Sequence, residues 1–510
     1  MKKSLYLLFS IALLCSLYIS DIYAVAPLPG SGLVEPKRPK APFEIVFHDS
    51  KTNIQRVTPR QNTPQVKMAP RGLLMLVEFP DVTFDSINTQ QAFDSLANGE
   101  NYTYNGAMGS CQAYFKAQSN GQYIPEFDVL GPLMLPQPIT YYGANAKDGN
   151  DQYIVDLVID ACSAADQMGV DFAQYDSDKD GMVDFVYIIY AGYAESEGAP
   201  ASTIWPHEWD LISALYYGYS NKTEYYANSD IDYKLPSFDG KLVNAYVCSN
   251  ELKRSNNARA GIGTICHEFS HFLGLPDYYL TTENPTTNQR LTPGAWSLMG
   301  YGNYLNDGNS PPNYSIYDKY YLGWVTPTIL AETQTLTLHA DGETGYMLTR
   351  NEQHVAEGAY RTDTVYYIEN RQQEGWDTYL PGHGMLIWQV IFDEKDWYNN
   401  CPNDHTPRYR LISALSTSSP YTTTKPKPEV PFPGSKNITK YTPFTHNKLE
   451  NIQETNGLIT CEFVTTSIPS NVENITTPIS GQWYNILGQP IDPNTYKGIA
   501  IHNNKKYLLR

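Results

Sequence analysis

Segment 267–277 limits the folds open to this chain more than any other, because it combines an amphipathic helix with residues that bind metals. Apolar residues recur at intervals of three and four over 262–273, which predicts a helix that packs one face against a core. His267 and His271 are one helical turn apart, so both imidazoles can reach a single ion. Glu268 lies beside them, where it can act as a general base.

A catalytic zinc ion usually takes three protein ligands and one water molecule, so the two histidines need a third partner. Gly274 favours the left-handed conformation that ends a helix, and Pro276 prevents the helix from resuming. This turn directs Asp277 back toward the metal. The alternative ligand is a glutamate from a later helix, but between Asp277 and Glu332 the sequence offers only Glu283, in a loop rich in Thr, Asn and Pro. We therefore expect Asp277 to be the third ligand.

Segment 295–301, with the sequence Ala-Trp-Ser-Leu-Met-Gly-Tyr, resembles the methionine turn that lies under the metal in metzincin proteases. We expect Met299 to form the apolar floor of the metal site. Tyr301 is placed as in those metzincins whose tyrosine approaches the zinc, so its hydroxyl could stabilise an oxyanion. An ordinary packed tyrosine is an equally good interpretation of Tyr301.

A second group of acidic residues predicts a calcium site. Oxygen-bearing residues alternate before Gly181, which supplies the sharp turn of a calcium loop. The twelfth position is Tyr187 rather than glutamate, and the residues before it resemble a strand, so we expect a structural calcium ion and not an EF-hand sensor. An acidic, solvated turn is the alternative. The expected ligands are Asp176, Asp178, Asp180, the main-chain carbonyl of Met182, and Asp184.

The N-terminal 66 residues predict export and latency. Residues 1–24 have a basic start, an apolar run and a small residue at the end, which is typical of a signal peptide. Residues 25–66 are rich in proline and charge and are expected to be a pro-segment. His48 and Asp49 are candidates for occupying the metal site there, although an ordinary surface pair is the simpler interpretation. No later segment is long and apolar enough to span a bilayer, so we expect a secreted or cell-surface protein without a transmembrane anchor.

The net charge of −18 disfavours nucleic acid and anionic membranes as partners, and it suits metal cations. Six of the seven cysteines remain if Cys15 leaves with the signal peptide, and their scattered positions match no metal-ligand spacing. Disulfides are permitted in an exported protein, but the sequence does not define their pairing. Cys266 on the metal helix is expected to be a core residue, and His207 is expected to be structural.

The length of 510 residues suggests two or three domains. Strand and helix patterns alternate over 67–328, which predicts an α/β zincin catalytic domain of metzincin-like type. Short alternating runs rich in Thr, Tyr and Val predict a β-sandwich over 329–464. A linker rich in Ser, Thr, Asn and Pro is expected over 465–478, followed by a small β-rich tail over 479–510.

With these motifs the chain resembles the immune-inhibitor-A-like family of secreted bacterial zinc metalloproteases. The resemblance implies a zinc endopeptidase with calcium-supported folding, in which His267 and His271 bind zinc and Glu268 is catalytic. Asp277 matches the Gly-x-Pro-Asp pattern of that family. The tail is similar to C-terminal sorting segments of exported Bacteroidota proteins, which implies secretion machinery as a partner. The segments that carry the family resemblance are 73–81, the Asp-rich loop, 187–192, the metal helix, 322–324, 367–371 and 380–388.

The expected reaction is hydrolysis of peptide bonds in extracellular proteins by a metal-activated water molecule. Glu268 would take the proton of the water and return it to the leaving amine, and Tyr301 would stabilise the developing charge. The alternative is a surface adhesin or carbohydrate-binding protein built on an inactive zincin scaffold. The intact Glu268 argues against that alternative, because an inactive scaffold does not need this carboxylate.

Overall fold

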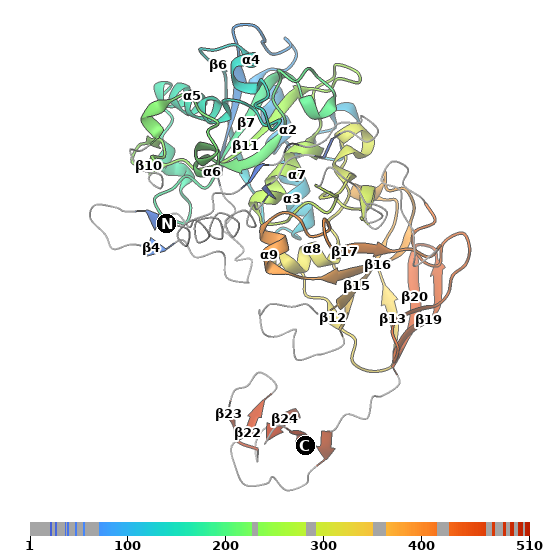
Figure 1. Cartoon of the computed structure of the whole chain (residues 1–510). Coiled ribbons are helices and arrows are strands. Elements are labelled where there is room, and N and C mark those ends of the chain that lie inside the picture. The colour runs from blue at the N-terminus through green and yellow to red at the C-terminus, as the bar shows by residue number, and fades with distance from the viewer. Residues whose placement is uncertain are drawn as a thin grey trace, which may run out of the picture.

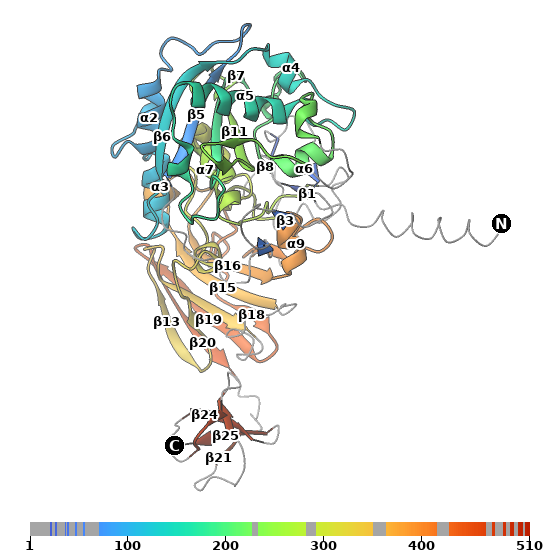
Figure 2. The ribbon, with the colours of Figure 1, turned by 90° about the vertical axis from the view of Figure 1, so that its left-hand side faces the viewer.

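The computed structural model describes residues 71–226, 233–281, 292–349, 364–415 and 428–465. It also describes short pieces at 21–22, 26–27, 36, 38–39, 46–47, 55–56, 472–474, 483–485, 490–493, 498–502 and 505–509. Most of the expected signal peptide and pro-segment, with His48 and Asp49, lies outside the described residues. An α/β region and a β-rich region pack against each other, and a small sheet lies near the C-terminus (Figures 1 and 2).

A mixed sheet of five strands forms the centre of the α/β region. In spatial order its strands are β6 (Glu126–Met134), β5 (Arg71–Glu78), β7 (Val186–Tyr193), β11 (Ala245–Leu252) and β8 (His207–Asp210). The first four run parallel, and β8 at the edge runs antiparallel to β11. Parallel strands covered on both faces are apolar throughout, and β5 and β7 accordingly show continuous apolar runs and not alternation.

Helices cover both faces of this sheet and produce two separate apolar clusters. On one face α2 (Gln90–Asn98), α3 (Cys111–Gln118) and α7 (Ile262–Phe272) pack against alternate strand residues such as Leu74 and Ile189. The remaining strand residues face the second cluster. The helices on that side are α4 (Ile139–Gly143), α5 (Ile154–Gln167) and α6 (Leu211–Tyr216). The sheet therefore places α7, the expected metal helix, on one defined face.

Several short elements complete the α/β region and its border. Helix α8 (Ile316–Tyr321) begins with a capping box formed by Ser315 and Asp318, and α9 (Glu394–Tyr398) begins after Asp393. The 3-10 helices are η2 (Tyr104–Gly106), η3 (Phe172–Tyr175), η4 (Glu195–Glu197), η5 (Thr223–Tyr225), η7 (Gly294–Trp296), η8 (Gly302–Gly308) and η10 (Gly375–Asp377). The strands β9 (Ser237–Phe238) and β10 (Lys241–Leu242) form a small hairpin.

Two sheets make up the β-rich region. The first has the order β12 (Thr328–Ile329), β14 (Gly345–Thr349), β15 (Thr364–Arg371), β16 (Gly384–Ile391) and β17 (Tyr409–Ile412). The second has the order β13 (Gln334–Leu338), β20 (Leu458–Thr465), β19 (Asn447–Thr455) and β18 (Tyr441–Phe444). Apolar side chains from both sheets share one cluster, so the two sheets pack together. The mixed α/β architecture with further β-rich structure is as expected from the sequence.

The first sheet of the β-rich region is covered on both of its faces. Tyr366 and Ile387 belong to the cluster shared with the second sheet. Their neighbours Tyr367 and Trp388 point the other way, into the same apolar cluster as α3 and α7. Because alternate residues of a strand face opposite sides, this sheet joins the two regions through a continuous core.

Small strand pairs lie toward both ends of the chain. Near the N-terminus β1 (Asp21–Ile22) pairs with β2 (Arg38–Pro39), and β3 (Val46–Phe47) pairs with β4 (Gln55–Arg56). The C-terminal sheet has the order β21 (Val472–Asn474), β25 (Lys505–Leu509), β24 (Gly498–His502), β22 (Trp483–Asn485) and β23 (Pro490–Ile491). Strand structure thus begins at β21, within the segment 465–478 that we expected to be a linker.

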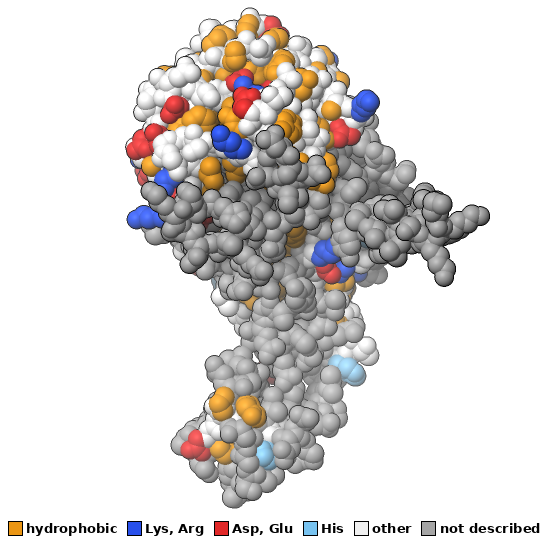
Figure 3. Space-filling model, turned by 60° about the vertical axis from the view of Figure 1, so that its left-hand side comes forward, with side chains coloured by type: hydrophobic (Ala, Val, Ile, Leu, Met, Phe, Trp, Pro, Cys, Tyr) orange, Lys and Arg blue, Asp and Glu red, His pale blue; other side chains and the backbone are white. Residues whose placement is uncertain are grey.

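On the face of the α/β region seen in Figure 3, acidic and basic side chains are interspersed among apolar and neutral ones. Among the described helices, none combines the length and the apolar character that crossing a membrane requires.

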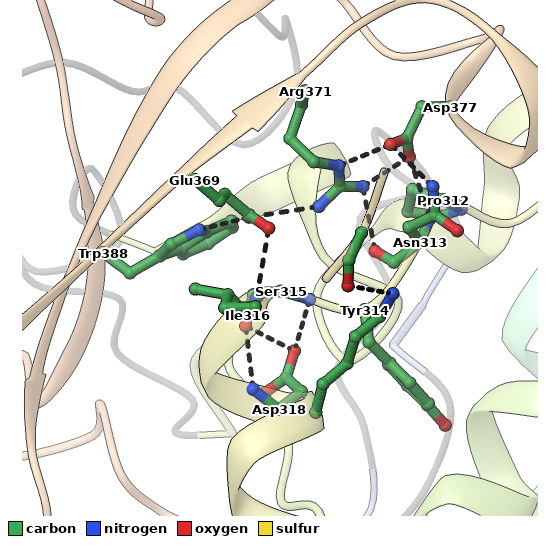
Figure 4. Close-up of polar contacts among 12 residues, drawn as sticks. Pro312, Asn313, Tyr314, Ser315, Ile316, Asp318, Glu369, Arg371, Asp377 and Trp388 are labelled. Carbon is green, nitrogen blue, oxygen red and sulfur yellow. Dashed lines mark hydrogen bonds and ion pairs between the residues drawn. The ribbon is translucent and has the colours of Figure 1, made fainter. Parts of the chain in front are cut away.

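A buried polar network also joins the two regions (Figure 4). Arg371 on β15 pairs with Asp377, and its guanidinium donates to the carbonyl of Asn313 at 2.9 Å. Asn313 in turn donates to Asp377 through its main-chain and side-chain nitrogens, at 2.9 and 2.8 Å. Glu369 accepts hydrogen bonds from Trp388 at 2.6 Å and from the N–H of Ile316 at 3.1 Å.

We predict that Arg371→Met lowers the free energy of unfolding by about 3–5 kcal/mol, because it leaves the buried carboxylates of Glu369 and Asp377 without their cation. Chemical denaturation measures this change. Arg71→Met is the control, since Arg71 pairs with Asp128 while both side chains are substantially exposed, and it should cost less than about 1 kcal/mol. Equal losses in the two variants would contradict the role of the buried network.

Candidate metal centre

The helix α7 and the turn after it bring the first site residues together. Leu273 caps the helix, and Gly274 follows with a φ of +100°, the left-handed conformation expected for it. The N–H of Gly274 donates to the carbonyl of His271 at 2.7 Å, which closes the last turn. The chain then reverses, so Asp277 returns to the histidine-bearing face of α7.

The backbone of η8 lies directly on the start of α7. A Cβ atom added to Gly263 would stand 2.0 Å from the carbonyl oxygen of Asn303, so only glycine allows this approach. The close contact fixes the segment that contains Tyr301 relative to the metal helix.

Three ligand atoms converge at the expected site. Nε2 of His267 lies 3.3 Å from Nε2 of His271, and Oδ1 of Asp277 lies 3.1 and 3.4 Å from the two nitrogens. In a tetrahedral zinc site with bonds of 2.0–2.1 Å, ligand atoms are roughly 3.3 Å apart. The separations therefore fit one tetrahedral ion, and all three side chains are buried.

The outer nitrogens of both histidines have acceptors that fix their tautomers. Nδ1 of His267 lies 2.9 Å from the carbonyl oxygen of Leu298, and Nδ1 of His271 lies 2.7 Å from that of Leu275. Because a carbonyl only accepts, each Nδ1 carries the proton and each Nε2 presents its lone pair. Both Nε2 atoms are thus prepared to bind a cation.

The carboxylate of Asp277 divides its two oxygens between different partners. Oδ1 is buried and faces both Nε2 atoms, and among the described residues no donor other than these two histidines reaches it. Oδ2 accepts a hydrogen bond of 2.6 Å from Nδ2 of Asn400, which lies after α9 in the β-rich region. One oxygen is therefore left for a metal while the other is held by an amide.

Electrostatics in the site favour a cation. Burial would raise the pKa of Asp277, but the neighbouring His271 and His267 lower it below its usual value. Burial lowers the pKa of His271. Burial also acts to lower the pKa of His267, but the hydrogen bond and charge of Asp277, with the charge of Glu268, raise it overall. The lowered pKa of Asp277 keeps its carboxylate ionised, and this negative charge favours a bound cation.

Glu268 is fully buried and follows His267 on α7. Burial raises the pKa of Tyr187 and of Tyr304 well above the usual value, and the charge of Glu268 contributes to both shifts. The charge of Glu268 therefore influences both phenols as well as His267. A carboxylate beside the metal ligands is what a general base requires.

The loop 274–281, which follows α7 and contains Asp277, is the metal loop. Met299 and Tyr301 both lie beside it. Met299 is fully buried, and its carbonyl accepts a hydrogen bond of 2.7 Å from the N–H of Tyr278, next to Asp277. The ring of Tyr301 lies 5.8 Å from that of Tyr279, whose ring stacks 6.4 Å from that of His267. Tyr279 thus contacts both, and sequence reasoning missed it because nothing in its local pattern marks it.

The expected calcium ligands come together only in part. Carboxylate oxygens of Asp176, Asp178 and Asp180 lie within 4.8 Å of one another. Asp184 is not in that group, and its carboxylate accepts hydrogen bonds from the N–H and hydroxyl of Ser177. The N–H of Met182 donates to Asp180 at 2.9 Å, and Nζ of Lys241 lies 2.6 Å from Asp176.

The two residues for which we expected structural roles are buried. Nδ1 of His207 lies 2.6 Å from the carbonyl oxygen of Trp205, and Nε2 lies 2.9 Å from the hydroxyl of Tyr246. Cys266 is buried on α7 within the apolar cluster.

A model for the catalytic domain of immune inhibitor A, peptidase M6, matches residues 67–325, about half of the chain. The chain belongs to the immune inhibitor A peptidase M6 family. This match confirms the family resemblance inferred from the sequence. The matched segment contains the two histidines, Glu268, Asp277 and Tyr301, and it ends before Asn400.

Two curated relatives support the assignment to the peptidase M6 family. The chain is 25% identical over 283 residues to Immune inhibitor A of Bacillus thuringiensis subsp. alesti, which covers 48% of the chain and 38% of that protein. It is 23% identical over 298 residues to Pre-pro-metalloprotease PrtV of Vibrio cholerae serotype O1, which covers 50% of the chain and 30% of that protein. The aligned part thus spans well under half of each relative.

We predict that His271→Ala weakens zinc binding by more than about 100-fold, since removing a ligand costs more than removing an outer-sphere partner. Competition with a chromophoric chelator measures the affinity. His383→Ala is the control, because His383 is largely exposed and pairs with Glu454 in the β-rich region. Unchanged zinc affinity in His271→Ala would contradict the ligand assignment.

Proposed function

We propose that this peptidase M6 chain is a secreted zinc endopeptidase that hydrolyses peptide bonds of extracellular proteins. The zinc ligands would be His267, His271 and Asp277. Glu268 would be the general base, and Tyr301 would stabilise the oxyanion. The observation that supports the proposal is the spacing of the three ligand atoms, 3.1, 3.3 and 3.4 Å, which suits one tetrahedral ion.

The chemistry follows from the residues around the site. Bound zinc would supply the charge that acidifies a water molecule and polarises the scissile carbonyl. Glu268, buried beside His267, would take the proton from the water and return it to the leaving amine. Tyr301 would donate its hydroxyl to the developing oxyanion, from a position held by Tyr279 and η8. An inactive scaffold would not need the buried Glu268.

Latency in this proposal comes from the pro-segment, residues 25–66. The carbonyl of Ala26 accepts a hydrogen bond of 2.5 Å from the hydroxyl of Tyr304, and Ala26 is fully buried. Tyr304 lies on η8, whose backbone packs on the start of α7, so the contact lies beside the proposed metal helix. A segment held there would obstruct substrate until it is removed.

Export in this proposal uses the two ends of the chain. Residues 1–24 would act as the signal peptide, and the C-terminal tail would be recognised by secretion machinery. In that tail the buried Trp483 stacks on His502 with ring centroids 4.6 Å apart, which gives the small sheet a folded centre.

We predict that Glu268→Gln keeps zinc bound but lowers kcat for peptide cleavage by at least about 100-fold, because the amide cannot accept the proton. Zinc content and turnover of a fluorogenic peptide are measured on the same preparation. Wild-type turnover by a zinc-loaded Glu268→Gln sample would refute the role of Glu268.

For Asp176, Asp178 and Asp180, we propose a structural calcium ion whose charge replaces that of Lys241 as the partner of Asp176. Asp184 and the carbonyl of Met182 would complete the ligands after a small rearrangement of the loop.

Calcium should then stabilise the fold by about 2.7 kcal/mol at a concentration 100 times its Kd, seen as a rise in Tm. Zinc is kept saturating so that only the calcium site changes. The double variant Asp178→Asn, Asp180→Asn should lose the calcium-dependent rise while keeping the calcium-free Tm, since both residues are exposed. A wild-type Tm that does not respond to calcium would exclude the site.

A further inference from the structure

Loop 399–409 of the β-rich region reaches the metal loop of the α/β region at Asn400. Nδ2 of Asn400 donates to Oδ2 of Asp277 at 2.6 Å, while Oδ1 of Asn400 accepts from the main-chain N–H of Asp277. One amide therefore forms hydrogen bonds with both the side chain and the backbone of the proposed third ligand. Asn400 is itself buried, with 1% of its surface exposed.

An asparagine suits this position for two physical reasons. A primary amide supplies one donor and one acceptor side by side without adding a charge next to Asp277. The backbone of Asn400 has a φ of +53°, a left-handed conformation that asparagine tolerates better than most residues. Because its donor occupies Oδ2, the other oxygen of Asp277 faces Nε2 of His267 and His271.

Further contacts, made by residues that follow Asn400, hold the two segments together. Nδ2 of Asn403 donates to the carbonyl of Tyr278 at 2.8 Å, and the rings of Tyr278 and Tyr409 stack with centroids 3.6 Å apart. Asp404 accepts from the N–H of Thr281 at 2.9 Å and from its hydroxyl at 2.6 Å.

Loop 399–409 is in turn anchored to its own region. The N–H of Ile391 at the end of β16 donates to the carbonyl of Arg408 at 2.7 Å, and the guanidinium of Arg408 pairs with Asp393 at 3.3 Å. Trp397, just before the loop, is buried in the cluster shared with α7. The position of Asn400 is therefore set by the β-rich region.

We propose that Asn400 is a positioning residue of the metal centre, so that the site is completed by the β-rich region and not by the family's catalytic segment alone. Asn400 orients Asp277 so that one carboxylate oxygen meets the ion and the other does not. This inference rests on the proposed function in one respect, namely that Asp277 binds zinc.

The test compares zinc affinities in the full chain by competition with a chromophoric chelator. Asn400→Gly removes the amide while accepting the left-handed backbone, and Asn400→Leu removes it while filling the space. Asn403→Gly is the matched control, because Asn403 is equally buried and binds the same loop without touching Asp277. Tm is measured for each variant with zinc saturating and with zinc removed.

Both Asn400 variants should bind zinc about 10–100-fold more weakly, the usual effect of losing a partner of a ligand. Their Tm should gain less from zinc than that of the wild type. Asn403→Gly should lower Tm in both conditions equally and leave the zinc affinity near that of the wild type. In an Asp277→Ala background, Asn400→Gly should cause no further loss of affinity.

Two results would overturn the inference in different ways. Wild-type zinc affinity in both Asn400 variants, or an equal loss of affinity in Asn403→Gly, would show that Asn400 has no specific effect on the ligand. A wild-type protein that binds no zinc would refute the proposed function and this inference together, so the two failures are distinguishable.

Discussion

The proposed metal centre depends on keeping one carboxylate ionised inside an apolar core. A buried carboxylate costs several kcal/mol unless positive charge and hydrogen-bond donors surround it. At Asp277 the imidazoles of His267 and His271 face one oxygen, and Asn400 donates to the other. Two of these partners lie one turn apart on α7, and the third lies in a loop of the β-rich region. The need to compensate one charge explains why these segments converge.

The convergence is possible because the first sheet of the β-rich region has two covered faces. Its one face packs on the second sheet, and its other face shares the cluster that contains α3 and α7. The polar contacts of Arg371 also join the two regions, since Arg371 and Asp377 belong to the β-rich region and Asn313 belongs to the α/β region. The two regions are therefore neighbours through a shared core. Through this contact a loop of one region lies within hydrogen-bond distance of a candidate ligand in the other.

Local sequence patterns were sufficient to predict the metal helix, the left-handed Gly274 that follows its end, and the return of Asp277 toward the histidines. Each of these features depends on residues only a few positions apart. The family, the α/β architecture and the further β-rich structure also followed from motifs and periodicity. The contact of Asn400 with Asp277 could not be predicted in this way, because the two residues are 123 positions apart and periodicity carries no information about such a distant pair. The pairing of Lys241 with Asp176 was missed for the same reason. The ring of Tyr279 beside His267 depends on how the loop folds over the helix, which composition does not encode.

The distance along the chain between Asp277 and Asn400 has a consequence for biosynthesis. Protein chains are made from the N-terminus, so the residues that would bind the ion exist before the residue that orients one of them. Until Asn400 and the strands around it have been made, the nascent chain has the ligands without their support. If the proposed centre needs that support, a partly translated chain would bind the ion more weakly than the finished protein.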